Sequence, residues 1–199
     1  MRIADVREGF TVKDVIIDLA DSLEIDGFEF VIYVPGADGY GVPPKLRLDY
    51  ETERVRATEL ETLRREMVGS LSELERAEAS YTLGLSSVVS AGGDQFHTPQ
   101  IDFGFGVSDE NLHRIYRYLE DIGQTEGYVI ESGNSYHFQG VDILPYTFWT
   151  RYMDSLDDNL VDGNWINSNL FERGFSVLRL TSAFGKPHVP KVVSRVYSK

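Results

Sequence analysis

The stretch from Tyr128 to Gln139 constrains the fold more than any other part of the sequence. Two short runs rich in aromatic and β-branched residues, Tyr128–Glu131 and Tyr136–Gln139, flank the segment Ser132-Gly-Asn134. Strand-forming residues on both sides of a short Ser, Gly and Asn turn are typical of a β-hairpin. The chain is therefore expected to contain antiparallel strands, and because helical segments surround them, the α+β class is indicated.

Helical and strand periodicities alternate along the rest of the chain. No internal repeat, low-complexity block or linker divides it, so residues 1–199 are expected to form a single domain with a mixed, largely antiparallel sheet flanked by helices. Residues 1–95 would form an N-terminal α/β portion of uncertain role. Helices are predicted over 12–23, 51–79, 109–122, 146–156 and 166–172, strands over 28–34, 45–50, 81–90, 100–107, 128–131, 136–139 and 175–181, and loops over 35–44, 91–99 and 157–162.

Composition limits the chemistry that the chain can perform. It contains no Cys, which excludes disulfides, thiolate zinc sites and a cysteine nucleophile. Catalysis or binding must then use carboxylates, the four His, hydroxyls, Arg or Lys. The formal net charge of −13 disfavours broad nonspecific binding to duplex nucleic acid, but it does not exclude a small nucleotide whose charge a metal neutralises.

No apolar run approaches the roughly 18 residues that span a bilayer, so no membrane association is expected. The first residues have neither the apolar core nor the cleavage site of a signal peptide, which makes a cytoplasmic location the expectation.

Four short patterns in the second half of the chain follow one another in a fixed order. They are Ile101-Asp-Phe-Gly104, Ser132-Gly-Asn-Ser-Tyr-His137, Val161-Asp162 and Gly174-Phe-Ser-Val-Leu-Arg-Leu180. In that order they resemble the archaeo-eukaryotic primase superfamily, whose primase-polymerases carry a D-x-D/E strand, an S-x-H strand, a hydrophobic-Asp motif and a downstream Arg. The resemblance extends from Gln100 to Val192 and implies a primase-polymerase-like (RRM-like) nucleotide-binding core within residues 96–199.

The resemblance implies a role for each matching residue. Asp102 and Asp162 would be catalytic ligands of Mg²⁺ or Mn²⁺, Ser135 and His137 would contact the triphosphate, and Arg179 would add a further phosphate contact. The residue types suit this chemistry, because Mg²⁺ prefers carboxylate and substrate oxygens, and hydroxyl, imidazole and guanidinium groups donate hydrogen bonds to phosphates. Ser135 and His137 are two positions apart, so both can face one side of a strand.

The sequence departs from the family pattern at Gly104, which replaces the second acid of the D-x-D/E motif. This favours a site with one metal ion over one with two. The expected partners are a nucleoside triphosphate and a single-stranded nucleic acid or primer-template end, in replication or repair. The alternative is a catalytically degenerate relative that binds nucleotide or nucleic acid as a regulatory or defence-associated module. A third alternative is an unrelated α+β domain with a protein partner.

Each candidate residue also has a structural interpretation. His137 could be a core histidine, Ser135 and Asp162 turn residues, and Arg179 a surface arginine on an alternating strand. Other residues are interpreted as structural or surface residues: His97, His113, His188, Trp149 and Trp165. A basic group near the end of the chain would either form a charged edge strand or track a nucleic-acid backbone; it consists of Lys186, Lys191, Arg195 and Lys199.

Overall fold

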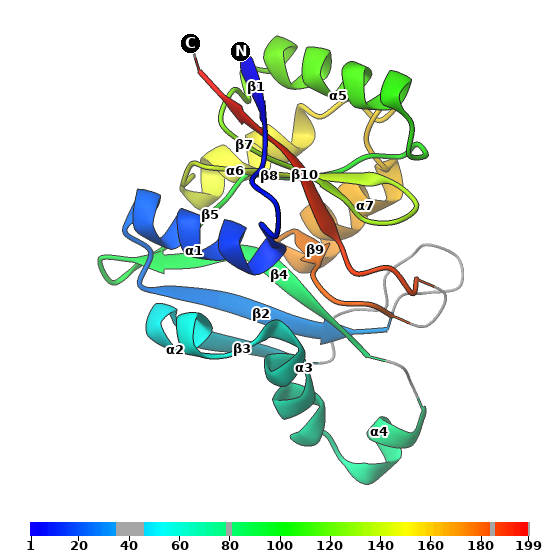
Figure 1. The fold of residues 1–199 in the computed structure, drawn as a ribbon. Coiled ribbons are helices and arrows are strands. Elements are labelled where there is room, and N and C mark those ends of the chain that lie inside the picture. The colour runs from blue at the N-terminus through cyan, green and yellow to red at the C-terminus, as the bar shows by residue number, and fades with distance from the viewer. Residues whose placement is uncertain (35–45, 79–80, 184–185, 199) are drawn as a thin grey trace.

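A computed structural model describes residues 1–34, 46–78, 81–183 and 186–198. The expected loop over 35–44 lies outside the described residues. The architecture is α+β, with two antiparallel sheets and helices packed against them (Figure 1). The α+β class and the largely antiparallel pairing are thus confirmed, but the expected single sheet is divided in two, and all the strand pairs described are antiparallel.

The first sheet has the order β1-β10-β7-β8-β6. The predicted hairpin is present as β7 and β8, and both ends of the chain join the same sheet, where β1 pairs with β10. The alternative of a charged edge strand for the tail is wrong, because β10 lies between β1 and β7, and its Val192 and Val196 are buried. The strands are β1 (Arg2–Asp5), β6 (Gln100–Asp102), β7 (Gly127–Glu131), β8 (Tyr136–Gly140) and β10 (Lys191–Tyr197).

The second sheet has the order β3-β2-β4-β5, and β9 also pairs with β4. The β4 strand is long enough for β9 to pair with Gly84–Ser86 and for β5 to pair with Val88–Ala91. Residues 91–99 were predicted to be a loop, but they contain β5, because the turn at Gly92 and Gly93, both with positive φ, folds the chain back onto β4. The strands are β2 (Gly27–Tyr33), β3 (Leu46–Glu51), β4 (Thr82–Ala91), β5 (Asp94–His97) and β9 (Val177–Arg179).

Helices cover these sheets on defined faces. Apolar residues of α1 and α3 pack against alternate residues of β2 and β4, while α5 and α6 pack on the outer face of the first sheet, where Trp149 is fully buried as expected. A capping box between Thr11 and Asp14 starts α1, and the Ser108 hydroxyl caps α5. The helices are α1 (Val12–Leu23), α2 (Thr52–Ala57), α3 (Leu60–Gly69), α4 (Glu73–Glu78), α5 (Asp109–Asp121), α6 (Tyr146–Asp154), α7 (Gly163–Asn167) and a π-helix η1 (Ser168–Arg173).

The helix predicted over 51–79 is not continuous, because the described part of this range forms three helices. Extended backbone at Thr58 and Glu59 separates α2 from α3, and a second capping box, between Ser72 and Glu75, starts α4. The breaks allow Val55 of α2 and Leu63 of α3 to reach the core from different directions. The predicted strand over 100–107 likewise ends at Asp102, and the predicted helix over 166–172 is divided between α7 and η1.

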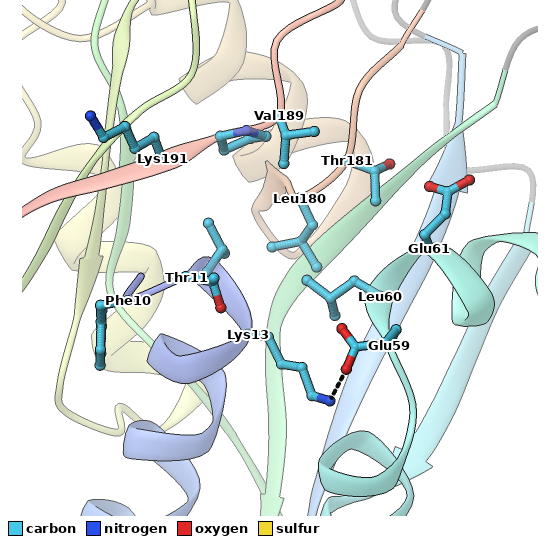
Figure 2. Close-up of a pocket in the computed structure, with 12 residues that line it drawn as sticks. Phe10, Thr11, Lys13, Glu59, Leu60, Glu61, Leu180, Thr181, Val189 and Lys191 are labelled. Atoms are coloured by element: carbon cyan, nitrogen blue, oxygen red, sulfur yellow. Dashed lines mark hydrogen bonds and ion pairs between the residues drawn. The ribbon is translucent and has the colours of Figure 1, made fainter. Parts of the chain in front are cut away.

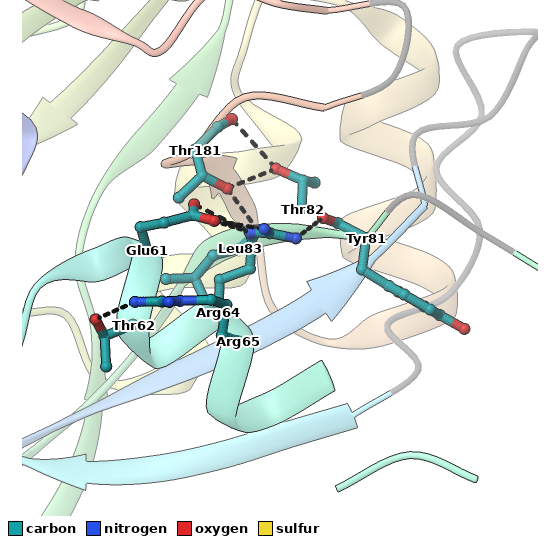
Figure 3. A network of polar contacts seen from close by, with 8 residues as sticks. All are labelled: Glu61, Thr62, Arg64, Arg65, Tyr81, Thr82, Leu83 and Thr181. Atoms are coloured by element: carbon teal, nitrogen blue, oxygen red, sulfur yellow. Dashed lines mark hydrogen bonds and ion pairs between the residues drawn. The ribbon is translucent and has the colours of Figure 1, made fainter. Parts of the chain in front are cut away.

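Polar contacts fasten α3 and β9 to β4 (Figure 3). Arg64 of α3 pairs with Glu61 and donates to the Tyr81 carbonyl at 3.0 Å, directly before β4. The Thr181 hydroxyl accepts from the Leu83 amide at 3.1 Å and contacts the Thr82 hydroxyl at 3.1 Å. These contacts anchor the chain directly after β9.

The two sheets meet at a buried amide, the side chain of Gln100 in β6. Its Nε2 donates to the Leu85 carbonyl at 3.3 Å and to Gln139 Oε1 at 3.0 Å, and its Oε1 accepts from the Ser176 hydroxyl at 2.9 Å. Since a buried amide is costly unless its groups are paired, this network favours one relative placement of β4, β6, β8 and the segment before β9. Of the helices described, none is both long enough and apolar enough to cross a membrane.

Candidate functional site

Asp102 and His137 are directly opposite each other on β6 and β8. Residues opposite each other on antiparallel strands project to the same face, and here His137 Nε2 lies 3.5 Å from Asp102 Oδ1. The Asp102 side chain is 24% exposed, whereas the His137 side chain is 6% exposed. The carboxylate therefore lies at the mouth of the site and the imidazole behind it.

Ser135 joins this pair from the turn before β8. Its hydroxyl is 3.4 Å from Asp102 Oδ1 and 3.0 Å from the Ser132 hydroxyl. Both contacts to the Asp102 carboxylate, from Ser135 and His137, are at the long end of hydrogen-bond distances. The carboxylate is thus held in place loosely enough for its oxygens to accept another partner.

Asp162 is brought beside Asp102 by the backbone. Its amide donates to the Asp102 carbonyl at 2.9 Å, next to the bridge between Phe103 and Val161. Asp162 is also the N-cap of α7, where Oδ1 accepts from the amides of residues 164 and 165. Asp162 is thus a turn residue, as the structural interpretation expects. Its Oδ2 accepts no such bond among the described residues and is available to a ligand.

The electrostatics of the Asp102 carboxyl reflect its surroundings. Burial raises its pKa from 3.8 to about 7, and the charge of the Asp162 carboxylate adds to the rise. Lys186, Ser135 and Arg179 act in the opposite direction. The contribution of Asp162 indicates that the two carboxylates are close enough to repel each other, which is the arrangement that a cation relieves.

Burial has the reverse effect on His137, lowering its pKa to about 3, and the charges of Arg179 and Lys186 act in the same direction. The imidazole is therefore neutral, and its buried Nδ1 has no hydrogen-bond partner among the described residues. With the proton on Nε2, the ring donates toward Asp102 and toward whatever binds in front of it.

Arg179 is buried, 5% exposed, so the alternative of a surface arginine is wrong. Strand β9 pairs with β4 in the second sheet, and the side chain reaches across to the first sheet. Its Nη1 donates to the carbonyls of Thr181 and His188 at 2.6 and 2.8 Å, and Nη2 donates to the carbonyl of Ser132. The guanidinium thus ties three backbone segments together beside the site while adding positive charge to it.

Two further residues act on the site, although the sequence patterns gave them no role there. Lys186 is exposed, and its charge acts on both Asp102 and His137. Burial raises the pKa of Tyr33, at the end of β2; the charge of Arg179 opposes the rise and that of Asp102 adds to it. The sequence pattern includes Lys186 after the Arg-bearing strand but gives it no role in the site, because its effect on Asp102 and His137 depends on the three-dimensional fold.

Gly104 faces Asp162. A Cβ at this position would lie 3.5 Å from the Asp162 amide nitrogen and 3.6 Å from its Cα, which are ordinary van der Waals distances. Gly104 is not among the glycines with positive φ. The backbone at position 104 would therefore accept a side chain, and the family's second acid is absent only because the sequence has Gly there.

The donor set fits a single metal ion only in part. No group of three or more His, Asp or Glu residues suited to a metal occurs among the described residues. Asp102 and Asp162 alone supply two carboxylates, whereas Mg²⁺ is usually held by one or two carboxylates together with substrate phosphates and water. The residues thus fit a cation that arrives with a polyphosphate.

The remaining histidines are not part of this arrangement. His97 is buried, contacts the Ser87 hydroxyl at 2.9 Å and stacks on Trp149 with ring centroids 4.5 Å apart. His113 lies on α5, where Nδ1 contacts the Asp109 carbonyl. His188 contributes its backbone carbonyl to Arg179. The prediction that these three are structural or surface residues is consistent with these positions.

A cavity of about 340 Å³ lies away from these residues, between the start of α1, the start of α3 and the segments around β9 and β10 (Figure 2). Its lining is mainly apolar and includes Leu60, Leu180 and Val189, and Lys13 is paired there with Glu59 at 3.0 Å. None of the predicted site residues lines it.

A family model and two solved structures are similar to the chain. The family model described as AEP-like, archaeo-eukaryotic primase 1D-like, matches residues 59–192. The crystal structure of the catalytic domain of primase RepB′ in complex with initiator DNA is similar over 90% of this chain and 82% of that chain, with a TM-score of 0.53 and 12% sequence identity. A crystal structure of primase RepB′ is similar over 93% of this chain and 56% of that chain, with a TM-score of 0.45 and 12% identity. None of the curated proteins compared with the chain matches it.

Proposed function

The chain belongs to the archaeo-eukaryotic primase 1D-like family, and from this premise we propose that it binds a nucleoside triphosphate with one divalent cation, Mg²⁺ or Mn²⁺, at Asp102 and Asp162. One observation carries the proposal. The Asp162 amide donates to the Asp102 carbonyl, the charge of Asp162 acts on the Asp102 carboxylate, and Ser135 and His137 both contact that carboxylate.

Each residue has a role that follows from its contacts. Asp102 and the free oxygen of Asp162 hold the cation, which when bound neutralises polyphosphate charge and lowers the pKa of an attacking hydroxyl. The Ser135 hydroxyl and the Nε2–H of the neutral His137 donate to phosphate oxygens. The exposed ammonium of Lys186, whose charge acts on Asp102, would add a charge-assisted contact.

Arg179 acts on the same ligand in two ways. Its charge favours a polyphosphate beside Asp102. Its bonds to the carbonyls of Ser132, Thr181 and His188 also fix the turn that carries Ser135. These bonds use three of the five N–H donors of the guanidinium, so the predicted phosphate contact would use the other donors, on Nη2 and Nε.

If the site is catalytic, the reaction is metal-assisted attack of a 3′-hydroxyl on the α-phosphate, with positioning and electrostatics supplying most of the rate. The nucleic acid would be a single strand or a primer-template end, which the initiator DNA in the RepB′ complex supports. A second candidate function is nucleotide or nucleic-acid binding without catalysis, in a regulatory or defence-associated role. Gly104 favours it, because the described residues hold no group of three acids or histidines suited to a metal, and two metal ions held by the protein need more than two carboxylates.

Template-dependent incorporation of a labelled nucleotide with Mg²⁺ and with Mn²⁺ separates the two functions. Activity in the native chain that Asp102→Asn abolishes would establish the enzyme. Activity only in Gly104→Asp would establish a degenerate site that still binds nucleotide. If neither protein incorporates nucleotide and neither is stabilised against heat by a nucleoside triphosphate with Mn²⁺, the proposal fails.

A further inference from the structure

Tyr33, the last residue of β2, belongs to the face of the second sheet from which Arg179 projects. Val31 of β2 is directly opposite Gly84 of β4, and Gly84 is directly opposite Arg179 of β9. Residues opposite each other on antiparallel strands share a face, and so do residues two apart on one strand. Tyr33, which follows Val31 by two residues, therefore projects to the same side of the sheet as Arg179.

The missing side chain of Gly84 lets the Tyr33 ring lie across β4. A Cβ at position 84 would lie 2.9 Å from Cε1 of Tyr33 and closer still to Cγ1 of Val177, so these two side chains already occupy the space over the glycine. The ring packs there against a small apolar cluster of Val31, Val88, Phe175 and Val177. Because Cε1 is bonded to the carbon that carries the hydroxyl, the polar end of the ring lies over β4, the strand that pairs with β9.

The charges around Tyr33 connect it with the Asp102 site. Burial raises the pKa of the Tyr33 hydroxyl, and the charge of Asp102 adds to the rise. The charges of Arg179 and Arg173 act in the opposite direction. The hydroxyl is therefore protonated at neutral pH and can donate a hydrogen bond. Two arginines and the Asp102 carboxylate are thus within electrostatic reach of this donor.

Tyr33 and Arg179 both have hydrogen-bond donors that the protein does not use. The Tyr33 hydroxyl has no partner among the described residues, and it is not one of the fully buried unpaired atoms there. Arg179 keeps donors on Nη2 and Nε beyond the three that its carbonyl partners accept. An anionic oxygen that accepts from both side chains would be held by charge-assisted hydrogen bonds, the stronger kind.

We propose that Tyr33 is a further phosphate-binding residue, whose hydroxyl and the remaining Arg179 donors hold a phosphate other than the one bound to the cation. This inference rests on the proposed function, because it requires a nucleotide whose cation is held by Asp102 and Asp162. A polyphosphate offers oxygens to both places, whereas a monophosphate has only one phosphate group to offer. Tyr33 therefore makes the site selective for nucleoside triphosphates over nucleoside monophosphates.

Calorimetric titration of ATP and of AMP into the full chain with saturating Mn²⁺ tests the proposal. Tyr33→Phe removes only the hydroxyl and keeps the ring that packs over Gly84. Tyr50→Phe is the matched control, because Tyr50 is a tyrosine of β3 that is buried opposite Phe28, in the core cluster on the other face of the sheet. The melting temperature of each protein without ligand shows whether either hydroxyl has a structural role.

We expect native protein and Tyr50→Phe to bind ATP alike, and Tyr33→Phe to bind ATP about tenfold more weakly, as the loss of one hydrogen bond to a charged group predicts. AMP should bind equally to all three proteins, and the melting temperature of Tyr33→Phe should stay within about 2 °C of the native value.

Two outcomes overturn the role of Tyr33 while the proposed function stands. One is that native protein and Tyr33→Phe bind ATP with Mn²⁺ equally well, and the other is that Tyr33→Phe weakens ATP and AMP by the same factor. If the native chain binds neither nucleotide with Mn²⁺, the proposed function fails and the role of Tyr33 fails with it.

Discussion

Replacing Gly104 by Asp adds a third carboxylate beside Asp102 and Asp162 without a steric penalty. A Cβ at position 104 lies at van der Waals distance from the Asp162 backbone, and the glycine does not need a positive φ. The consequences of Gly104→Asp should therefore be electrostatic. Because the sign of the change in stability depends on whether a cation is present, the substitution distinguishes a metal site from an ordinary group of acids.

The magnitude follows from the charges. Two unit charges about 6 Å apart repel by roughly 3 kcal/mol at an effective dielectric constant of about 20, and protonation of one carboxyl relieves part of this. Asp102, with its pKa raised to about 7, can take up that proton. Without metal, we expect the free energy of unfolding of Gly104→Asp to fall by about 1–3 kcal/mol. With Mn²⁺ and a nucleoside triphosphate, affinity for the cation should rise at least about tenfold, equal to about 1.4 kcal/mol.

Urea unfolding in EDTA and again with saturating Mn²⁺ and nucleotide measures both effects. Gly106→Asp is the matched control, since it adds the same charge two residues further along, where a Cβ approaches only the Asn134 carbonyl, at 3.9 Å. If Gly104→Asp and Gly106→Asp lose equal stability in EDTA, or if Mn²⁺ with nucleotide fails to offset the loss in Gly104→Asp, the inferred placement of the carboxylates is refuted.

Three further predictions follow from the same contacts. In metal-free protein, the raised pKa of Asp102 makes the free energy of unfolding fall as pH rises from about 4 to about 7. The lowered pKa of His137 makes the free energy of unfolding increase as pH rises from about 3 to 6.5. The two effects therefore largely cancel between about pH 4 and 6.5. Urea unfolding of Asp102→Asn should therefore show stability increasing with pH over that window, and an unchanged profile would contradict the pKa shifts. Arg179→Met should lose about 2–5 kcal/mol of stability by leaving buried carbonyls without donors, whereas the exposed Arg151→Met should lose less than about 0.5 kcal/mol, and equal midpoints in urea would show that the buried bonds contribute nothing. Gln100→Leu should cost about 2–4 kcal/mol by unpairing several buried groups at the junction of the sheets, and a loss below about 1 kcal/mol would assign that junction to apolar packing.

Local patterns predict the elements whose signals lie within a few residues. The hairpin of β7 and β8 and the Ser108 cap of α5 appear where the sequence indicates them. The helix over 51–79 fails because helical spacing continues across Thr58 and Glu59, although the chain extends there to place Val55 and Leu63 in one core. Periodicity describes which residues are buried, but it does not describe the direction from which they enter the core.

Long-range pairing limits what the sequence reveals about the site. The i, i+2 relation of Ser135 and His137 gives their shared face, and the family pattern brings in Asp162. The position of Arg179 cannot be inferred in this way, because β9 belongs to one sheet while its side chain bonds to the other. Lys186 is missed for the same reason, since its proximity to Asp102 depends on the return of the chain after β9.

Calorimetry with a nucleoside triphosphate tests the central claim most directly, with native protein and Asp102→Asn compared in the presence of Mn²⁺ and in EDTA. The proposed site predicts binding of one nucleotide per chain that requires Mn²⁺ and weakens at least about tenfold in Asp102→Asn. Equal binding by the two proteins, or no binding heat from the native chain with Mn²⁺, would contradict it.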